Sequence, residues 1–178
     1  MSEKVVYLMR GLPSCGKTHT ARWLAGETGL VCETDEYFYT HVGDDPNHYD
    51  FSMELMPEAR RWNLERFRKA VDAGVSPVVV DRGNGRSEQT RVYARYAVDQ
   101  GYRVELREPQ SPWWQEIRVL LKYKKYTWPV LEAWAVRLTR MNDATHRTTK
   151  ASILNRMRKW DHKLTVESIL SFEPVGKM

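Results

Sequence analysis

The sequence has little cysteine and no long hydrophobic run. Its two cysteines, Cys15 and Cys32, are too few for a disulfide framework, which predicts a protein of the reducing cytoplasm. No apolar stretch approaches the roughly 18 residues that cross a bilayer, so we expect no membrane partner. The apolar run at residues 5–9 is also too short for a signal peptide. Histidine and cysteine show no metal-ligand spacing, and we therefore expect no protein-held zinc site.

Length and composition favour one globular domain. Hydrophobic residues make up 42% and charged residues 29% of the sequence, proportions that are typical of a folded protein. A chain of 178 residues is long enough to bury a substantial core. Because there is no internal repeat, low-complexity stretch or linker, we expect a single domain over residues 1–178.

Positive charge is concentrated in the C-terminal third of the sequence. Residues 118–163 contain twelve Lys or Arg against three acidic residues, whereas residues 1–116 contain fifteen against eighteen. Such a surface attracts polyanions, meaning nucleic acid or nucleotide phosphates. A solvated helical face has the same composition, so charge alone leaves both interpretations open.

Short apolar segments alternate with amphipathic ones. Strands are predicted at residues 4–9, 30–34, 77–80 and 102–107. Helices are predicted at residues 18–27, 57–73 and 87–100, the last with Ser87 as its cap, and residues 37–51 are expected to be irregular. After Pro112 the pattern is helical, with interruptions expected at Pro129 and around residues 142–149. The alternation predicts an α/β fold, with a parallel sheet, helices on both faces and a basic helical lid or substrate segment at residues 113–163.

Residues 11–18 read GLPSCGKT and match the GxxxxGK(S/T) pattern of a phosphate-binding loop, or P-loop. The match follows a predicted strand and opens a predicted helix, which is the context that such a loop needs. The Lys17 ammonium is expected to reach the β- and γ-phosphates of ATP, and the Thr18 hydroxyl to join the shell of a Mg²⁺ ion. The loop residues expected to contact the nucleotide are Gly11, Pro13, Ser14, Cys15, Gly16, Lys17 and Thr18. A thiol at a helix N-terminus can have a lowered pKa, but Cys15 is expected to be only a small side chain that fills the loop.

Two carboxylates directly follow predicted strands. Asp35 comes after residues 30–34 and Asp81 after residues 78–80, and ligands of open α/β sheets bind beyond the carboxyl ends of the strands. One carboxylate would support Mg²⁺ or its bound water, and the other would accept a proton from an attacking hydroxyl. Helix caps and turns use the same residue types, and the role of Glu36 stays open.

Basic residues near this edge are candidates for binding the acceptor or the transferred phosphate. Arg82, Asn84 and Arg86 follow the third strand and are expected to bind the acceptor. Arg140 and Arg147 lie in the interrupted helical region, where a cation on a lid would stabilise the phosphoryl oxygens in the transition state.

Aromatic residues alternate with lysine and arginine in the same C-terminal region. They are Trp113, Trp114, Tyr123, Tyr126, Trp128 and Trp134, close to Lys122, Lys124, Lys125 and Arg137. Aromatic rings beside cations can stack on single-stranded bases. Most tryptophans are core residues, however, and the i, i+4 spacing of Trp134 and Leu138 predicts a packed stripe.

These motifs carry a family resemblance. The strings GLPSCGKT, TDEYF at residues 34–38 and VVVDRGN at residues 78–84, with the later pairs GY and EP, resemble the polynucleotide-kinase-like P-loop family over about four fifths of the chain. The resemblance implies that Lys17 and Thr18 hold ATP and Mg²⁺, and that Asp35 deprotonates a 5′-hydroxyl of DNA or RNA. It further implies that Asp81 lies near the acceptor and the metal, and that a lid arginine clamps the β- and γ-phosphates.

The chain departs from the family pattern mainly where the acceptor should bind. Ser14 stands where glycine is usual, and a positive φ there would cost about 1 kcal/mol. Glu36 replaces a second aspartate, and residues 82–83 replace a typical Asn-Thr pair. Two alternatives therefore stay open beside a polynucleotide kinase. One is a kinase of a nucleoside, sugar or antibiotic hydroxyl, and the other is a P-loop NTPase or nucleotide-binding switch without an acceptor.

Overall fold

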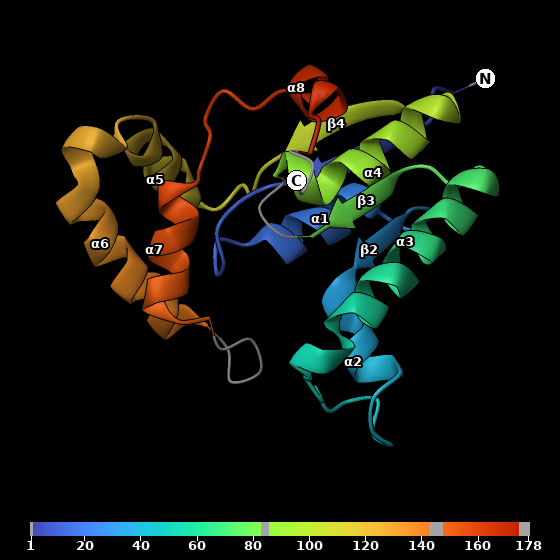
Figure 1. Ribbon diagram of the computed structural model, residues 1–178, viewed down its shortest axis with the longest axis horizontal. Coiled ribbons are helices and arrows are strands. Elements are labelled where there is room, and N and C mark those ends of the chain that lie inside the picture. Colours follow the sequence, from blue (N-terminus) through green and yellow to red (C-terminus); the bar gives the residue numbers. More distant parts are fainter. Residues whose placement is uncertain (1, 83–85, 143–147, 175–178) are drawn as a thin grey trace.

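A single parallel sheet lies at the centre of the computed structural model, which describes residues 2–82, 86–142 and 148–174. Its strands are β1 (Val5–Met9), β2 (Leu30–Glu33), β3 (Val78–Asp81) and β4 (Arg103–Arg107), in the order β2-β3-β1-β4 (Figure 1). β1 pairs with both β3 and β4, so that Val6 lies opposite Val78 on one side and Val104 on the other. The central strands are apolar because they are buried on both faces. This arrangement confirms the predicted α/β fold.

Helices cover both faces of the sheet, as predicted. α1 (Lys17–Ala25) packs Ala21 and Ala25 against Met9 and Val79 on one face. The other face is covered by α3 (Met56–Asp72), α4 (Ser87–Asp99) and the short α8 (Val166–Ser171). From β1 to β2 the chain crosses the sheet in one direction, and from β2 to β3 and on to β4 it crosses in the other. Because crossovers between parallel strands are right-handed, the helix of the first connection lies on one face and the helices of the later connections lie on the other.

The basic C-terminal region forms three helices on the phosphate-loop side of the sheet (Figure 1). They are α5 (Pro112–Lys122), α6 (Lys124–Met141) and α7 (Lys150–Arg158), and we call them the helical segment. Their buried side chains form a core of their own, which Leu12 and Cys15 extend into the phosphate loop. The helical segment is therefore packed directly against the loop.

Lys124 fixes the end of α7 within this segment. Its Nζ atom donates hydrogen bonds to the carbonyl oxygens of Met157, Arg158 and Trp160, at 3.3, 2.7 and 2.8 Å. A cation at a helix C-terminus bonds the last carbonyls and interacts favourably with the helix dipole. The chain thus leaves α7 in a fixed direction toward α8.

Three local predictions differ from the structure. Pro129 does not interrupt a helix, because α6 continues through it and the break falls at Tyr123. Packing of Leu131 and Leu138 in the segment core offsets the hydrogen bond that a proline inside a helix cannot make. Ser87 is not a cap: Arg86 has the extended N-cap backbone, and Ser87 is the first helical residue. The predicted irregular stretch after β2 contains a one-turn helix, α2 (Tyr37–Thr40).

The edge strand β4 carries charged side chains at alternate positions. Glu105 lies 3.3 Å from Arg103 and 2.8 Å from Arg107, measured between carboxylate oxygen and guanidinium nitrogen. Arg103 also lies 3.5 Å from Glu3.

Among the described helices, none is long and apolar enough to cross a membrane.

The core of the helical segment can be tested by truncation. Leu121 is 1% exposed, so Leu121→Ala should lower the free energy of unfolding by about 2–5 kcal/mol, through lost burial and the cavity left behind. Val119, two residues earlier on α5, is 56% exposed, and Val119→Ala should change it by less than about 0.5 kcal/mol. Denaturant unfolding of both variants measures the difference, and equal losses would contradict this packing.

Candidate nucleotide-binding and acceptor site

The phosphate loop has a backbone that few residues other than glycine adopt. Ser14 has φ 63° and Gly16 has φ 86°, so two residues of the loop lie in the left-handed region. Gly11 is required for another reason: a Cβ atom there would lie 2.9 Å from the ring of Pro109. Alternating left- and right-handed residues turn successive amide N–H groups toward one point, where they can bind an anion. The positive φ at Ser14 is the strain that the sequence anticipates.

The outward-facing carbonyls of the loop are bonded by the start of α5. Ser111 Oγ donates to the Cys15 carbonyl at 2.8 Å, and Trp113 Nε1 donates to the Ser14 carbonyl at 3.0 Å. The Ser14 hydroxyl in turn donates to Asn142 Oδ1, at the end of α6, at 2.7 Å. The loop is thus held by two side chains at the start of α5 and by one side chain at the end of α6.

Asp81 meets the end of the phosphate loop at the carboxyl end of β3. Thr18 Oγ1 donates to Asp81 Oδ2 at 3.0 Å, and Lys17 Nζ lies 3.8 Å from Asp81 Oδ1. Asp81 Oδ1 is buried and makes no hydrogen bond with the described residues. A hydroxyl and a carboxylate are hard oxygen ligands of the kind that Mg²⁺ prefers, and Mg²⁺ needs few protein ligands when it also binds phosphates. Thr18 and Asp81 therefore fit a Mg²⁺ ion.

Asp35 lies at the same edge of the sheet, one turn after β2. It belongs to a short 3₁₀ helix (Thr34–Glu36), and Tyr49 donates its hydroxyl to Asp35 Oδ1 at 3.4 Å. Burial, followed by the charge of Asp35, raises the pKa of the Tyr49 hydroxyl, which therefore stays protonated and donates to the carboxylate.

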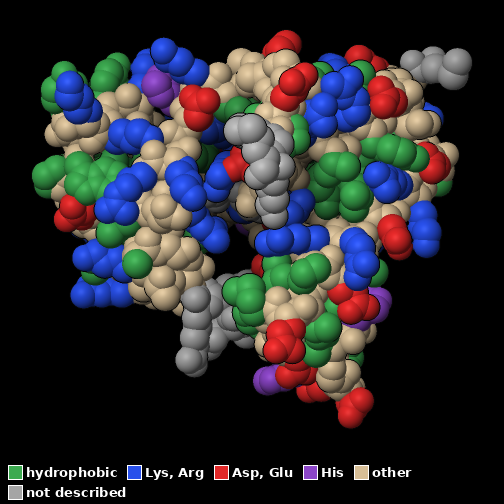
Figure 2. All heavy atoms as spheres, in the orientation of Figure 1, with side chains coloured by type: hydrophobic (Ala, Val, Ile, Leu, Met, Phe, Trp, Pro, Cys, Tyr) green, Lys and Arg blue, Asp and Glu red, His purple; other side chains and the backbone are tan. Residues whose placement is uncertain are grey.

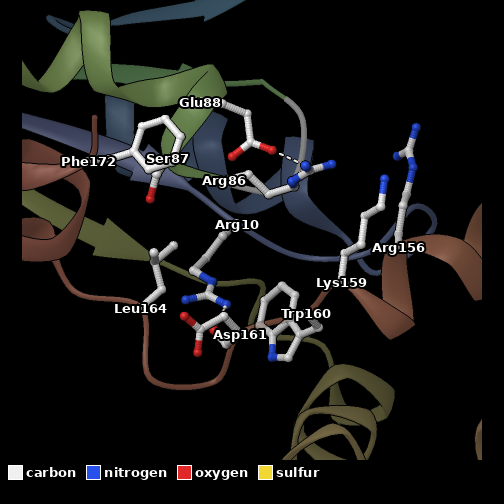
Figure 3. Close-up of a pocket in the computed structure, with 10 residues that line it drawn as sticks. All are labelled: Arg10, Arg86, Ser87, Glu88, Arg156, Lys159, Trp160, Asp161, Leu164 and Phe172. Atoms are coloured by element: carbon white, nitrogen blue, oxygen red, sulfur yellow. Dashed lines mark hydrogen bonds and ion pairs between the residues drawn. The ribbon is translucent and has the colours of Figure 1, made fainter. Parts of the chain in front are cut away.

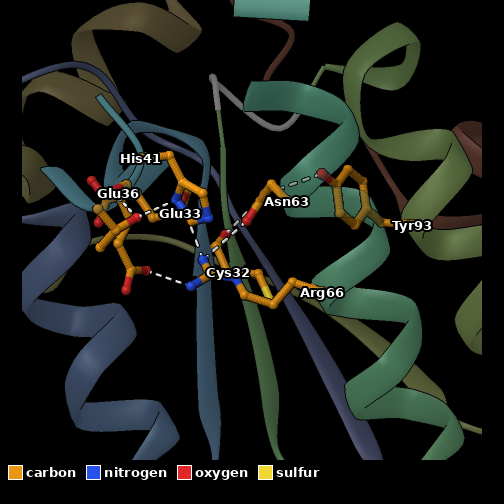
Figure 4. A network of polar contacts seen from close by, with 8 residues as sticks. Cys32, Glu33, Glu36, His41, Asn63, Arg66 and Tyr93 are labelled. Atoms are coloured by element: carbon orange, nitrogen blue, oxygen red, sulfur yellow. Dashed lines mark hydrogen bonds and ion pairs between the residues drawn. The ribbon is translucent and has the colours of Figure 1, made fainter. Parts of the chain in front are cut away.

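The neighbouring Glu36 is part of a polar network beneath the site (Figure 4). Arg66 Nη1 donates to Glu36 Oε2 at 2.6 Å, and Arg66 Nη2 donates to the Glu33 carbonyl and to Asn63 Oδ1. The fully buried Asn63 donates in turn to the Tyr93 hydroxyl at 3.1 Å. Glu36 thus holds α3 against the end of β2 and keeps the segment with Asp35 in place.

The predicted acceptor residues lie in different surroundings. Arg82 is half-buried and donates to the Gln89 carbonyl at 2.9 Å, so its guanidinium is used within the fold. Arg86, at the start of α4, forms an ion pair with Glu88. Asn84 lies outside the described residues.

The basic residues of the predicted lid region differ in their exposure to solvent. Arg140 is exposed on α6, and Arg147 lies outside the described residues. Arg156 on α7, which the sequence analysis missed, is half-buried and close enough to Asp35 for the two charges to interact. Burial lowers the pKa of the Arg156 guanidinium, and the charge of Asp35 opposes that shift. The buried positions Ile153, Met157 and Trp160 place Arg156 beside the packed stripe of α7, a signal that helical periodicity could have supplied.

Most of the predicted aromatic platform is core. Trp114 is fully buried, and Trp134 packs with Leu138 as its spacing predicts. Tyr123 and Tyr126 are 51% and 80% exposed, with the nitrogens of Lys122 and Lys125 within 5.6 and 5.8 Å of the ring centres. These two tyrosines are the platform residues that remain open to a base.

Comparison with known proteins identifies the family. Residues 6–118, more than half of the chain, match the family described as an AAA domain. The chain belongs to this AAA-domain family. The matched region holds the phosphate loop, Asp35 and Asp81, and the chain is accordingly a P-loop nucleotide-binding domain of the kinase-like type. The match ends within α5, so that α6, α7 and α8 lie beyond it.

The chain is also similar to regions of much longer animal proteins. It is 33% identical to human NEDD4-binding protein 2 over 113 residues, which are 62% of this chain and 6% of that protein. It is 29% identical to human YLP motif-containing protein 1 over 127 residues, or 60% of this chain and 6% of that protein. The rat form of the latter is 28% identical over 127 residues, covering 60% of this chain and 9% of that protein. The AAA-domain chain therefore spans less than a tenth of each relative.

The cysteines of this AAA-domain chain should be unreactive in the folded state. Burial raises the pKa of the Cys15 thiol to about 12 and that of Cys32 to about 11. At pH 8 about one thiol in a thousand or fewer would then be ionised. Alkylation with iodoacetamide, followed by mass spectrometry, should be at least about a hundredfold slower in native protein than in denaturant. Fast native labelling of Cys15 would instead indicate a reactive loop thiol.

Proposed function

We propose that this chain is a Mg²⁺-ATP-dependent kinase that transfers the γ-phosphate to a 5′-hydroxyl of DNA or RNA. The observation that carries the proposal is a second carboxylate, Asp35, at the sheet edge that holds the phosphate loop, with the cation of Arg156 within its electrostatic reach. Nucleotide binding alone would need Lys17, Thr18 and Asp81 but not this additional pair. A hydroxyl acceptor needs both a base and charge stabilisation on the transferred group.

The donor half of the reaction uses the phosphate loop. The loop amides and Lys17 would hold the β- and γ-phosphates of ATP, and Thr18 and Asp81 would hold Mg²⁺. When bound there, Mg²⁺ neutralises charge on the phosphate oxygens. The contacts of Asp81 with Lys17 and Thr18 support this assignment, because they bring the proposed nucleotide and metal groups together.

The acceptor half depends on Asp35 and Arg156. Asp35 accepts the proton of the attacking hydroxyl while the acceptor oxygen bonds to the γ-phosphorus. The bond from that phosphorus to the β–γ bridging oxygen breaks, and ADP leaves. Arg156 stabilises the negative charge on the transferred group, in the role that the sequence analysis assigns to Arg140 or Arg147. Tyr49, by donating to Asp35, orients the carboxylate.

Charge and exposed aromatic rings favour nucleic acid as the acceptor. Figure 2 shows Lys and Arg side chains gathered over the helical segment. Tyr123 and Tyr126 are exposed beside lysines on the same segment, and such pairs stack on single-stranded bases. A small neutral acceptor needs neither feature. We also propose a cytoplasmic setting, which suits two cysteines that are free thiols.

The variant Asp35→Asn tests the proposed base, because it should lower phosphoryl transfer without changing ATP binding. Asp35→Asn should lower the rate of label transfer from γ-labelled ATP to a 5′-hydroxyl oligonucleotide by about 10²–10⁴-fold, because the base is lost. Its ATP affinity, measured by calorimetry, should stay within about threefold of the unaltered chain, since the phosphate loop is intact. The matched control is Asp99→Asn, which changes an exposed carboxylate at the C-terminus of α4. This variant should transfer label at the normal rate. Normal transfer by Asp35→Asn would exclude this residue as the base.

The nature of the acceptor is decided by a panel assayed with the unaltered chain. It contains 5′-hydroxyl DNA and RNA oligonucleotides, nucleosides, sugars and a sample without acceptor. Label on an oligonucleotide 5′ end is the expected result. Label on a small molecule alone would make the protein a small-molecule kinase, and free phosphate alone would make it an NTPase.

Arg156 should act on the chemical step. Arg156→Gln is expected to lower kcat for transfer by about a hundredfold or more, because a cation on the transferred phosphoryl group is lost. Arg158→Gln removes an exposed arginine from the same helix, where it lies over the ring of Trp128, and should leave kcat nearly unchanged. Equal kcat values for the two variants would contradict the role given to Arg156.

A further inference from the structure

A cationic cavity lies beside the phosphate loop, between the start of α4 and the end of α7 (Figure 3). Its volume is about 360 Å³, and none of residues 11–18 lines it. Arg86 and Glu88 enter from the α4 side and Arg156 and Lys159 from the α7 side, and Arg10 and Trp160 lie below them in the view of Figure 3. The cavity is thus separate from the nucleotide site but shares Arg156 with the proposed acceptor side.

The most unusual lining residue is Arg10, the last residue before the phosphate loop. It is 4% exposed, it packs 3.9 Å from the ring centre of Trp160, and its Nη2 atom donates to the Asp161 carbonyl at 2.5 Å. Its Nε atom is buried without a hydrogen bond, and no carboxylate of the described residues lies within 4.0 Å of its guanidinium. The Asp161 carboxylate accepts a bond from the Lys163 amide instead. The charges of Glu108 and Asp161 act on the guanidinium from beyond that distance, but burial is the larger effect and lowers the pKa of Arg10. An anion in the cavity would therefore stabilise this buried cation further.

The other groups around the cavity add to this positive charge. Among the described residues, Lys159 forms no ion pair, Arg86 pairs only with Glu88, and Arg156 interacts with the charge of Asp35. The N-terminus of the 13-residue helix α4 also opens here, and helix N-termini favour anions. Four cations thus face two carboxylates, those of Glu88 and Asp161.

We propose that this cavity is a second phosphate site, which takes a phosphodiester group of the acceptor strand while its 5′-hydroxyl lies at Asp35. The inference rests on the proposed function. Arg156 links the two places, because it lines the cavity and interacts with the charge of Asp35. An acceptor that spans both must carry a phosphate downstream of its reacting hydroxyl, so the site selects strands over nucleosides. A free phosphate ion has the same chemistry, and the experiment distinguishes the two sources.

The first arm measures KM for transfer to acceptors that differ in phosphate number, namely a nucleoside, a dinucleoside monophosphate and a trinucleotide. In the unaltered chain, KM should fall at least about tenfold on adding the first or second phosphate, as expected for a charge-assisted contact. Lys159→Ala should remove most of that gain, and as the side chain is exposed the variant should fold normally. Lys163→Ala has the same charge change outside the cavity and should keep the full gain.

The second arm measures binding without catalysis. Lys17→Ala weakens the phosphate loop, and calorimetry then follows inorganic phosphate and the dinucleoside monophosphate, with and without Lys159→Ala. Tighter binding of the dinucleoside that Lys159→Ala weakens about tenfold supports the strand site. Binding of inorganic phosphate that depends on Lys159, with no gain for the dinucleoside, would overturn the strand assignment in favour of a free ion.

The two proposals fail in different ways. If no acceptor is phosphorylated but the dinucleoside still binds in a Lys159-dependent manner, the kinase proposal falls and the phosphate site stands. If oligonucleotides are phosphorylated but neither KM nor binding depends on Lys159, the phosphate site falls and the kinase proposal stands.

Discussion

The site depends on one constraint of the phosphate loop: a backbone that turns its amides inward must turn its carbonyls outward. Buried carbonyls need partners, and here Ser111 and Trp113 supply them for Cys15 and Ser14. The loop geometry is therefore maintained by a segment about 100 residues later in the sequence. Movement of α5 away from the loop would leave those carbonyls unbonded, so the loop and the helical segment form one unit.

The groups around the candidate site come from two parts of the chain. The groups that suit a nucleotide lie in the region shared with the AAA-domain family, which ends at residue 118. Arg156 on α7 and Lys159, which caps the end of α7, lie beyond it. Trp160 joins the parts by packing on Arg10, the residue that leads into the phosphate loop. Under the proposed function, a shared phosphate loop and Asp35 with separate cations would let related chains keep one chemistry and differ in their acceptors.

Local patterns predicted the strands and the loop that bring Lys17, Thr18 and Asp81 together, whereas the surroundings of the basic residues required tertiary structure. The loop at residues 11–18 and Asp81 follow from short-range spacing, because strand, loop and helix are consecutive in the sequence. Helical periodicity could have placed Arg156 beside a buried stripe, but only packing decides which of the twelve basic residues lies within electrostatic reach of Asp35. Pro129 was misjudged for a similar reason, as burial along α6 outweighs the local cost of a proline.

The charged edge strand β4 has a consequence for how copies of the protein meet. A free strand edge is a template for pairing with another chain, and proteins discourage this with charged side chains. Along β4, Arg103, Glu105 and Arg107 already satisfy one another, and an identical strand laid alongside would disturb their pairs. The sheet can therefore end at this edge without inviting aggregation, even though no further strand of the described residues covers it.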